Sequence, residues 1–164
     1  RRGNLIHANE SIVYLNKGES GFNTLQNHNI ISTELGSIGM AVDRVDCNQD
    51  GKVDVVIGNE RGKWHLFKNQ SLDAKNNNYI TVEVGNSKSG KTSALGAIVE
   101  VTSCKNAQKQ RVGSTGAQYS LSHNTFVHFG LGGCSSVEVK VTWTNGETET
   151  KIISTLNKRI KIGS

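Results

Sequence analysis

The chain has 164 residues, with 19 Lys and Arg against 14 Asp and Glu, a net charge of +5, and no proline. This length suits one large domain or two small ones and is enough to bury a core. No apolar run approaches the roughly 20 residues that cross a bilayer. No signal peptide is visible at residues 1–4, so we expect a chain that is either intracellular or already trimmed.

Strands dominate the predicted elements. Alternating or β-branched segments recur between turn clusters, and no segment shows a sustained helical stripe. In chain order the predicted strands are 11–15, 39–45, 53–57, 64–67, 79–84, 97–101, 125–129 and 137–143. The sequence therefore predicts an all-β protein.

An oxygen-rich loop separates the second and third of these strands. It reads Asp46-Cys47-Asn48-Gln49-Asp50-Gly51-Lys52-Val53-Asp54. Oxygen-bearing side chains stand at the first, third, fifth and ninth positions, with glycine at the sixth, where the chain must turn sharply. Ca²⁺ prefers several such oxygen ligands, carboxylates and backbone carbonyls among them. The loop predicts a calcium site whose ligands are Asp46, Asn48, Asp50, the carbonyl of Lys52, and Asp54.

Two other interpretations apply to a loop of this composition. An EF-hand needs flanking helices and a glutamate at position 12, where this chain has Ile57 between strand-forming segments. A polar hairpin turn remains open, since Asp, Asn and Gly populate turns for conformational reasons. Its clustered acids would repel one another without a cation. Cys47 is not an expected ligand, because thiolates suit softer metals.

Residues 85–92 match the phosphate-binding pattern G-x-x-x-x-G-K-[ST] and follow a predicted strand. That pattern binds nucleotides only where it opens into a helix, whose N-terminal N–H groups hold the phosphates. Here Gly96 and a β-branched run over 97–101 predict a second strand instead. A hairpin connection is the better interpretation. The five histidines are dispersed, so no active site is expected, and an ATP-dependent enzyme is the least favoured function.

Charge is uneven along the chain. Residues 1–77 hold nine Lys/Arg and nine Asp/Glu, whereas residues 78–164 hold ten and five. The basic half could attract a sulfated glycan, anionic lipid or nucleic acid, or could simply be a solvated surface. Nucleic acid is least favoured, since few aromatics stand among the cations. The candidate ligand-binding residues are Lys105, Lys109, Arg111, Lys158, Arg159, Lys161 and, as a stacking ring or a core residue, Trp143.

Cysteines and sequons favour an extracellular or secretory location. Cys104 ends one predicted strand and Cys134 precedes another, so the two could form a disulfide that leaves out Cys47. The triplets that begin at Asn9 and Asn69 permit glycosylation. The predicted calcium site also favours this location, because cytosol keeps Ca²⁺ scarce.

The segment 39–69 resembles an FG-GAP (integrin-like) repeat. The similarity lies in the Asp/Asn loop, the exit strand 55–59 and the last strand, which ends at Asn69. Residues 12–22 are similar to the closing strands of a preceding repeat. This resemblance implies a β-propeller blade whose loop binds Ca²⁺.

Residues 78–162 resemble an ASPIC/UnbV domain, which implies a sandwich- or barrel-like domain that follows a propeller. The similarity is carried by segments 94–101, 110–116, 119–122, 128–132 and 139–146. One departure is Thr144, where the family usually has proline after the tryptophan.

The expected organisation is therefore an FG-GAP part over residues 1–77 and an ASPIC/UnbV-like part over 78–164. One blade cannot close a propeller, so we expect the chain to be a fragment, a processed product or a strand-swapped unit, completed by upstream repeats. The expected function is a non-enzymatic, calcium-binding, extracellular recognition or adhesion module with a protein or glycan ligand. A carbohydrate-binding module for an acidic or sulfated polysaccharide is the alternative. No nucleic acid partner and no membrane span are expected.

Overall fold

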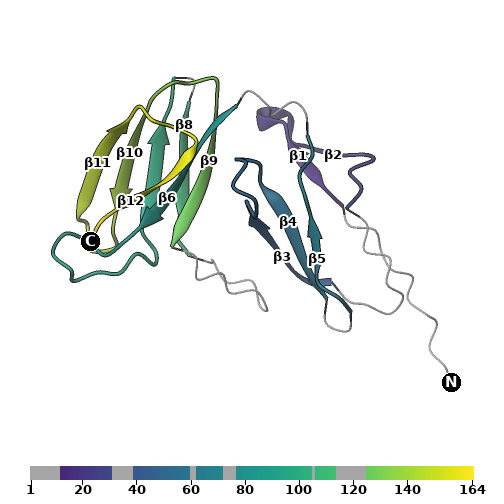
Figure 1. The fold of residues 1–164 in the computed structure, drawn as a ribbon, viewed down its shortest axis with the longest axis horizontal. Helices are drawn as coiled ribbons and strands as arrows, with labels where there is room; N and C mark the ends of the chain where they lie inside the picture. Colours follow the sequence, from purple (N-terminus) through teal and green to yellow (C-terminus); the bar gives the residue numbers. More distant parts are fainter. Residues whose placement is uncertain (1–11, 31–38, 60–61, 72–76, 105, 114–124) are drawn as a thin grey trace. The chain divides into compact units, whose positions relative to one another are not determined.

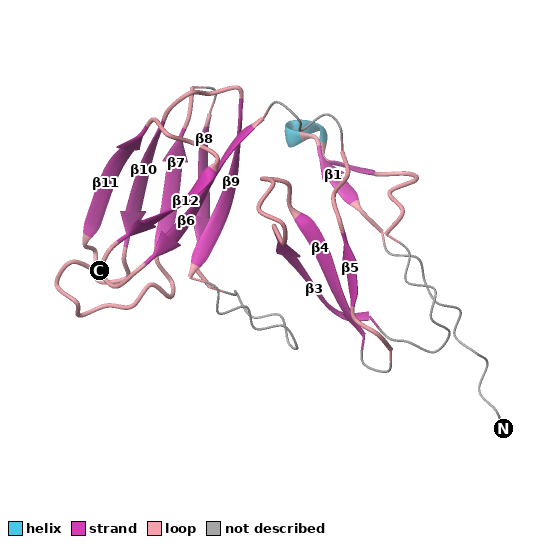
Figure 2. Ribbon diagram, in the orientation of Figure 1, coloured by secondary structure: helices cyan, strands magenta, loops and turns pink. Residues whose placement is uncertain are grey.

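The computed structural model describes residues 12–30, 39–59, 62–71, 77–104, 106–113 and 125–164 (Figure 1). Nearly all of its regular elements are strands, beside one short 3₁₀ turn (Figure 2). The predicted all-β class is confirmed. The described residues contain neither a closed barrel nor a propeller, and within them no helix has the length and apolarity to cross a membrane.

The chain divides into two compact units. The first comprises Arg1–Val45 and Asp54–Lys68, and the second comprises Asp46–Val53 and Asn69–Ser164. The sequence placed the boundary after residue 77. In the structure, the segment that follows Lys68 and the oxygen-rich loop both group with the C-terminal unit.

The first unit contains a hairpin and a three-stranded meander. The hairpin strands are β1 (Tyr14–Asn16) and β2 (Phe22–Thr24), with the 3₁₀ turn η1 (Gly18–Ser20) between them. The meander strands, all antiparallel in the order β3-β4-β5, are β3 (Gly39–Val45), β4 (Asp54–Asn59) and β5 (His65–Phe67). β3, β4 and β5 lie where the sequence predicted strands, within a residue or two at each end.

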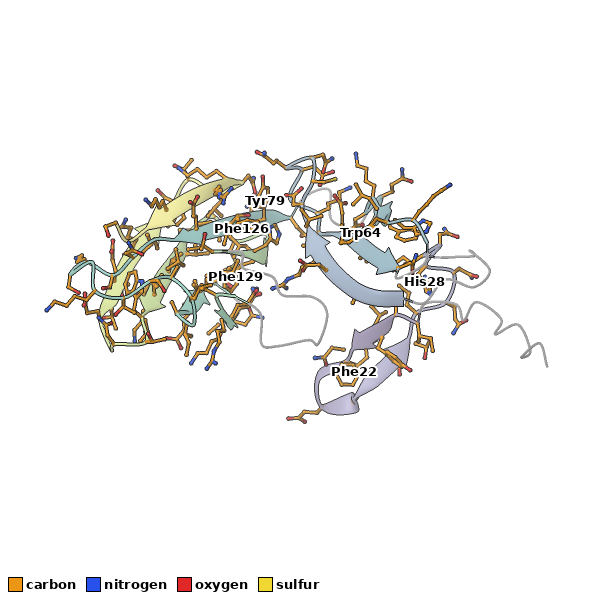
Figure 3. All side chains as sticks on the ribbon, turned by 90° about the horizontal axis from the view of Figure 1, so that it is seen from below. Phe22, His28, Trp64, Tyr79, Phe126 and Phe129 are labelled. Carbon is orange, nitrogen blue, oxygen red and sulfur yellow. A yellow bond between two sulfur atoms is a disulfide. The ribbon has the colours of Figure 1, made fainter. Side chains whose placement is uncertain are left out.

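The meander exposes apolar side chains on both faces. Val42 pairs with Ile57, and Leu66 pairs with the neighbouring Val56, so Val42 and Leu66 point to opposite sides of the sheet. Both are exposed, Leu66 to 56%. Trp64 (Figure 3) is 75% exposed. A single sheet layer with apolar groups on both faces is typical of an element that packs between neighbours.

The second unit is a sandwich of two sheets. One has the order β11-β10-β7-β8 and is antiparallel throughout; the other has the order β12-β6-β9, in which β12 runs parallel to β6. The strands are β6 (Asn78–Val84), β7 (Ile98–Thr102), β8 (Ala107–Arg111), β9 (Phe126–Gly132), β10 (Val137–Thr142), β11 (Thr148–Ile153) and β12 (Lys158–Ile162).

The core lies between these two sheets. Alternate residues of β7 and β10 are fully buried and meet the buried residues of β6, β9 and β12 in one apolar cluster. β-Branched side chains suit this role because they stand off the pleated surface and lose little rotamer freedom there. Fully buried members are Ile80, Val82, Val99, Val101, Phe129, Val139, Val141 and Ile162.

In the second unit, the strands that the sequence analysis did not predict are β8, β11 and β12. Each lies at a sheet edge. Edge strands carry charged and polar residues, which prevent edge-to-edge association and blur the alternation of apolar residues. β8 also joins the two sheets, because Gln108 and Gln110 donate side-chain hydrogen bonds to the carbonyls of Gly130 and His128 on β9 (2.7 and 2.6 Å).

A disulfide joins Cys104 and Cys134, the pairing predicted from the sequence. Cys104 follows β7 in one sheet, and Cys134 follows β9 in the other. The bond therefore ties the end of β7 to the segment that connects β9 with β10. The carbonyl of Cys134 also accepts a hydrogen bond from the side chain of Asn78 (2.9 Å).

Removing this disulfide should destabilise the second unit. The bond spans 30 residues, and closing a loop of that length in the unfolded chain is worth about 3–4 kcal/mol in the chain-entropy account. The double variant C104A/C134A should lose a similar free energy of unfolding, measured by urea denaturation. Cys47→Ala is the control and should change stability by less than about 0.5 kcal/mol. Equal midpoints for the double variant and the wild type would contradict the expected role.

Candidate functional site

The oxygen-rich loop between β3 and β4 is closed by its first aspartate. The carboxylate of Asp46 accepts hydrogen bonds from the backbone N–H groups of Asp50 and Gly51 (3.0 and 2.9 Å). The chain can double back there because Gln49 and Gly51 have positive φ angles of 57° and 85°. The glycine at position six is thus required by the backbone, as the sequence predicted.

The side chains of Asn48 and Asp50 interact on the same loop. Asp50 accepts a hydrogen bond from the Asn48 side-chain amide (2.8 Å) and another from the backbone N–H of Lys52 (2.9 Å). Both side chains are exposed. Asp46 and Asp50 therefore present their carboxylates from one short, tightly turned segment.

Three contacts hold the loop to the rest of the second unit. The side chain of Asn69 donates to the carbonyl of Val53 (3.2 Å), and the ammonium of Lys52 donates to the carbonyl of Ser71 (2.9 Å). The hydroxyl of Tyr79 donates to the carbonyl of Gln49 (3.2 Å). Sequence analysis did not find these anchors. The sequence marked Asn69 only as a sequon and as the end of a predicted strand, whereas its side-chain nitrogen binds the loop.

Gly51 lies directly against the ring of Tyr79. A Cβ added at this glycine would collide with ring carbons of Tyr79. The pKa of the Tyr79 hydroxyl is raised above 10.0, first by burial and then by the negative charges of Asp46 and Asp50. Both carboxylates thus lie close enough to act on Tyr79, and its hydroxyl stays protonated as a hydrogen-bond donor.

The predicted ligands fit Ca²⁺ in chemistry but are brought together only in part. Asp46, Asn48, Asp50 and the Lys52 carbonyl belong to the turned segment and offer only hard oxygen donors. Asp54 is the first residue of β4 and is 1% exposed. No group of three or more His, Cys, Asp or Glu side chains converges in a metal-holding arrangement within the described residues. Cys47 is exposed and takes no part in the disulfide.

The candidate ligand-binding set of the C-terminal half does not form one surface. Trp143 is 2% exposed and belongs to the core, with its indole N–H donating to the carbonyl of Gly85 (3.0 Å). Its interpretation as a stacking ring for sugars is wrong, because the core covers both ring faces. Lys105 lies outside the described residues.

The cations of this set are divided between two sheets. Lys109 and Arg111 belong to β8, whereas Lys158, Arg159 and Lys161 belong to β12. Lys109 pairs with Glu100 (2.6 Å), and Arg159 pairs with Glu83 (3.0 Å). Arg159 also lies 4.6 Å from the ring centre of Phe126 (Figure 3). Acidic partners thus offset part of the positive charge.

The phosphate-loop lookalike leads into a strand, as expected. After β6 the chain passes through turns over residues 85–97 and enters β7 without a helix. The carboxylate of Glu147 accepts hydrogen bonds from the hydroxyl of Ser87 (3.3 Å), from the hydroxyl of Ser89, and from the Ser89 N–H (3.2 Å). The hydroxyls of Ser87 and Ser89 and the Ser89 N–H, which would have to face a phosphate, therefore bind a carboxylate instead.

One comparison with known proteins matches the chain. Residues 86–164 match the family model described as ASPIC and UnbV. The chain is therefore similar to ASPIC/UnbV domains over residues 86–164. The matched segment contains β7 to β12, and therefore the whole β11-β10-β7-β8 sheet. No curated protein matches the chain.

We expect Glu147 to make the stability of the second unit depend on pH. Hydrogen bonds from the Ser89 side chain, and then from the Ser89 backbone, Asn145 and Ser87, hold its pKa below 4.5. A depressed pKa stabilises the fold above the unfolded-state pKa, and this contribution is lost as pH falls through the folded-state pKa. Glu147→Gln should therefore lower the melting temperature at pH 7.

The difference in melting temperature between the wild type and Glu147→Gln should shrink as pH is lowered from about 5 to about 3, because the wild-type carboxylate then becomes protonated and, like glutamine, uncharged. Thermal melts across this range would measure it. Glu138→Gln, an exposed site at the other end of β10, is the matched control. A difference in melting temperature that stays constant at every pH would contradict the role of the Glu147 carboxylate.

Proposed function

We propose that the chain is a non-enzymatic, calcium-binding recognition module that works outside the cell. Its first unit would be the C-terminal part of an FG-GAP repeat array, and its ASPIC/UnbV domain would follow that array. The ligand would be an extracellular protein or glycan.

The loop of residues 46–54 carries this proposal. Asp46 closes the turn, Gly51 adopts the required positive φ, and Asp50 lies between them with Asn48 bound to it. In a hairpin without a metal, Asp46 and Asp50 would repel each other. A Ca²⁺ ion would supply the positive charge that relieves this repulsion and would make the loop rigid. Asp46, Asn48, Asp50, Asp54 and the Lys52 carbonyl would hold it.

The shape of the first unit supports the repeat interpretation. The β3-β4-β5 meander follows the order of strands expected from the FG-GAP resemblance, and apolar side chains such as Val42 and Leu66 are exposed on opposite faces. A propeller blade buries both faces against neighbouring blades. Upstream repeats would cover these side chains.

The disulfide supports an extracellular location. Disulfides form and persist in oxidising compartments, and Cys104–Cys134 ties the end of β7 to the segment between β9 and β10. No observation of similar weight favours the carbohydrate-binding alternative. Trp143 is in the core, and the described candidate cations are divided between two sheets.

Calcium should raise the melting temperature of the wild-type chain, because an ion that binds only the folded state stabilises it by about 2.7 kcal/mol at a hundred times its Kd. Asp50→Ala should abolish most of this rise and change the melting temperature little in chelator. Differential scanning calorimetry in calcium and in EDTA would measure both. Asp43→Ala, on the exposed part of β3, is the matched control and should keep the full calcium response. If calcium leaves the wild-type melt unchanged, the site does not exist.

A further inference from the structure

We propose that Tyr79 of β6 is a positioning residue for the calcium loop, so that calcium binding and the fold of the second unit stabilise each other. This inference rests on the proposed calcium site. Tyr79 would not touch the ion. It would act through the loop backbone on either side of Asp50.

Two contacts connect Tyr79 with the loop. Its hydroxyl donates to the carbonyl of Gln49, one residue before Asp50 (3.2 Å). Its ring packs against Gly51, one residue after Asp50, where any larger side chain would collide with it. The backbone is therefore held on both sides of Asp50 by a single side chain.

Tyr79 itself is held firmly. Its backbone N–H donates to the side-chain oxygen of Asn157 (3.0 Å), and its carbonyl accepts from the Asn157 N–H (2.9 Å). Its ring stacks on His128, with ring centres 5.3 Å apart and an angle of 19° between the planes. His128 in turn interacts with Thr81 (3.2 Å). Residues of β6 and β9, and the turn before β12, thus orient the ring.

These contacts also affect the positions of the proposed ligand oxygens. The Asp46 carboxylate binds the N–H groups of Asp50 and Gly51, so a shift of the backbone at Gly51 also moves the partners of Asp46. The positive φ of Gln49 is a conformation that residues other than glycine rarely adopt, so a free loop would readily leave it. An anchor that keeps the loop in this conformation before the ion arrives reduces the ordering cost of binding. By linkage, the bound ion strengthens the same anchor equally.

Calcium titration of the full chain tests this inference. Tyr79→Phe removes the hydroxyl and keeps the ring, its stacking on His128 and its contact with Gly51. A hydrogen bond of this kind corresponds to a change of about three- to tenfold in affinity. Isothermal titration with calcium chloride should show a dissociation constant raised by about that factor. The matched control is Tyr14→Phe in β1, an exposed tyrosine, which should bind as the wild type does.

Hydrogen exchange distinguishes positioning from general destabilisation. In chelator, Tyr79→Phe should accelerate exchange of the amides of Asp50 and Gly51 while the amides of β6 and β9 exchange at wild-type rates. Faster exchange throughout β6 and β9 would show a merely structural role and would overturn the inference.

The outcomes separate the two proposals. If the wild type and Tyr79→Phe bind calcium with the same dissociation constant, the role of Tyr79 is overturned, and the calcium site is still supported. A wild-type chain that gives no calcium isotherm overturns the calcium site and, with it, the role of Tyr79. Weaker binding confined to Tyr79→Phe, with faster exchange confined to the loop, supports both.

Discussion

Burial of β-branched and aromatic side chains between two sheets is the constraint on which the second unit depends. Val99, Val101, Val139 and Val141 from one sheet meet Ile80, Val82, Phe129 and Ile162 from the other, all without solvent exposure. At about 25 cal/mol per Å² of apolar surface, this burial contributes more than a single hydrogen bond, which is worth about 1 kcal/mol. Because strands alternate, this burial also decides which residues point outward.

The outward face of β6 and β9 follows from that alternation. Tyr79 and Thr81 alternate with the buried Ile80 and Val82, and His128 pairs with Thr81 across the strands. The stacked pair of Tyr79 and His128 is thus placed by the core beneath it. Since Tyr79 holds the loop at Gln49, the proposed calcium site depends on a hydrophobic core that contains none of its ligands.

The polar residues of this domain serve mainly to close edges and turns. Gln108 and Gln110 satisfy carbonyls at the edge of β9, and Glu147 satisfies the Ser87–Ser89 turn that resembles a phosphate loop. Buried or half-buried polar groups cost free energy unless they find such partners. A short motif that matches a nucleotide-binding pattern therefore has a structural role here, because its donors are already used.

Local pattern was enough to predict the all-β class, the central strands and the glycine at position 51, because period-two alternation and turn geometry involve neighbouring residues. The order of the strands only allowed the disulfide between Cys104 and Cys134, which the fold brings together across 30 residues. The polar edge strands β8, β11 and β12 were not predicted, because apolar and polar residues need not alternate along an edge strand. The burial of Trp143 and the separation of Lys109 from Arg159 depend on which strands become neighbours. Tyr79 lies far from the loop in sequence, and only the folded sandwich brings its hydroxyl to Gln49, since that contact is set by packing between distant segments.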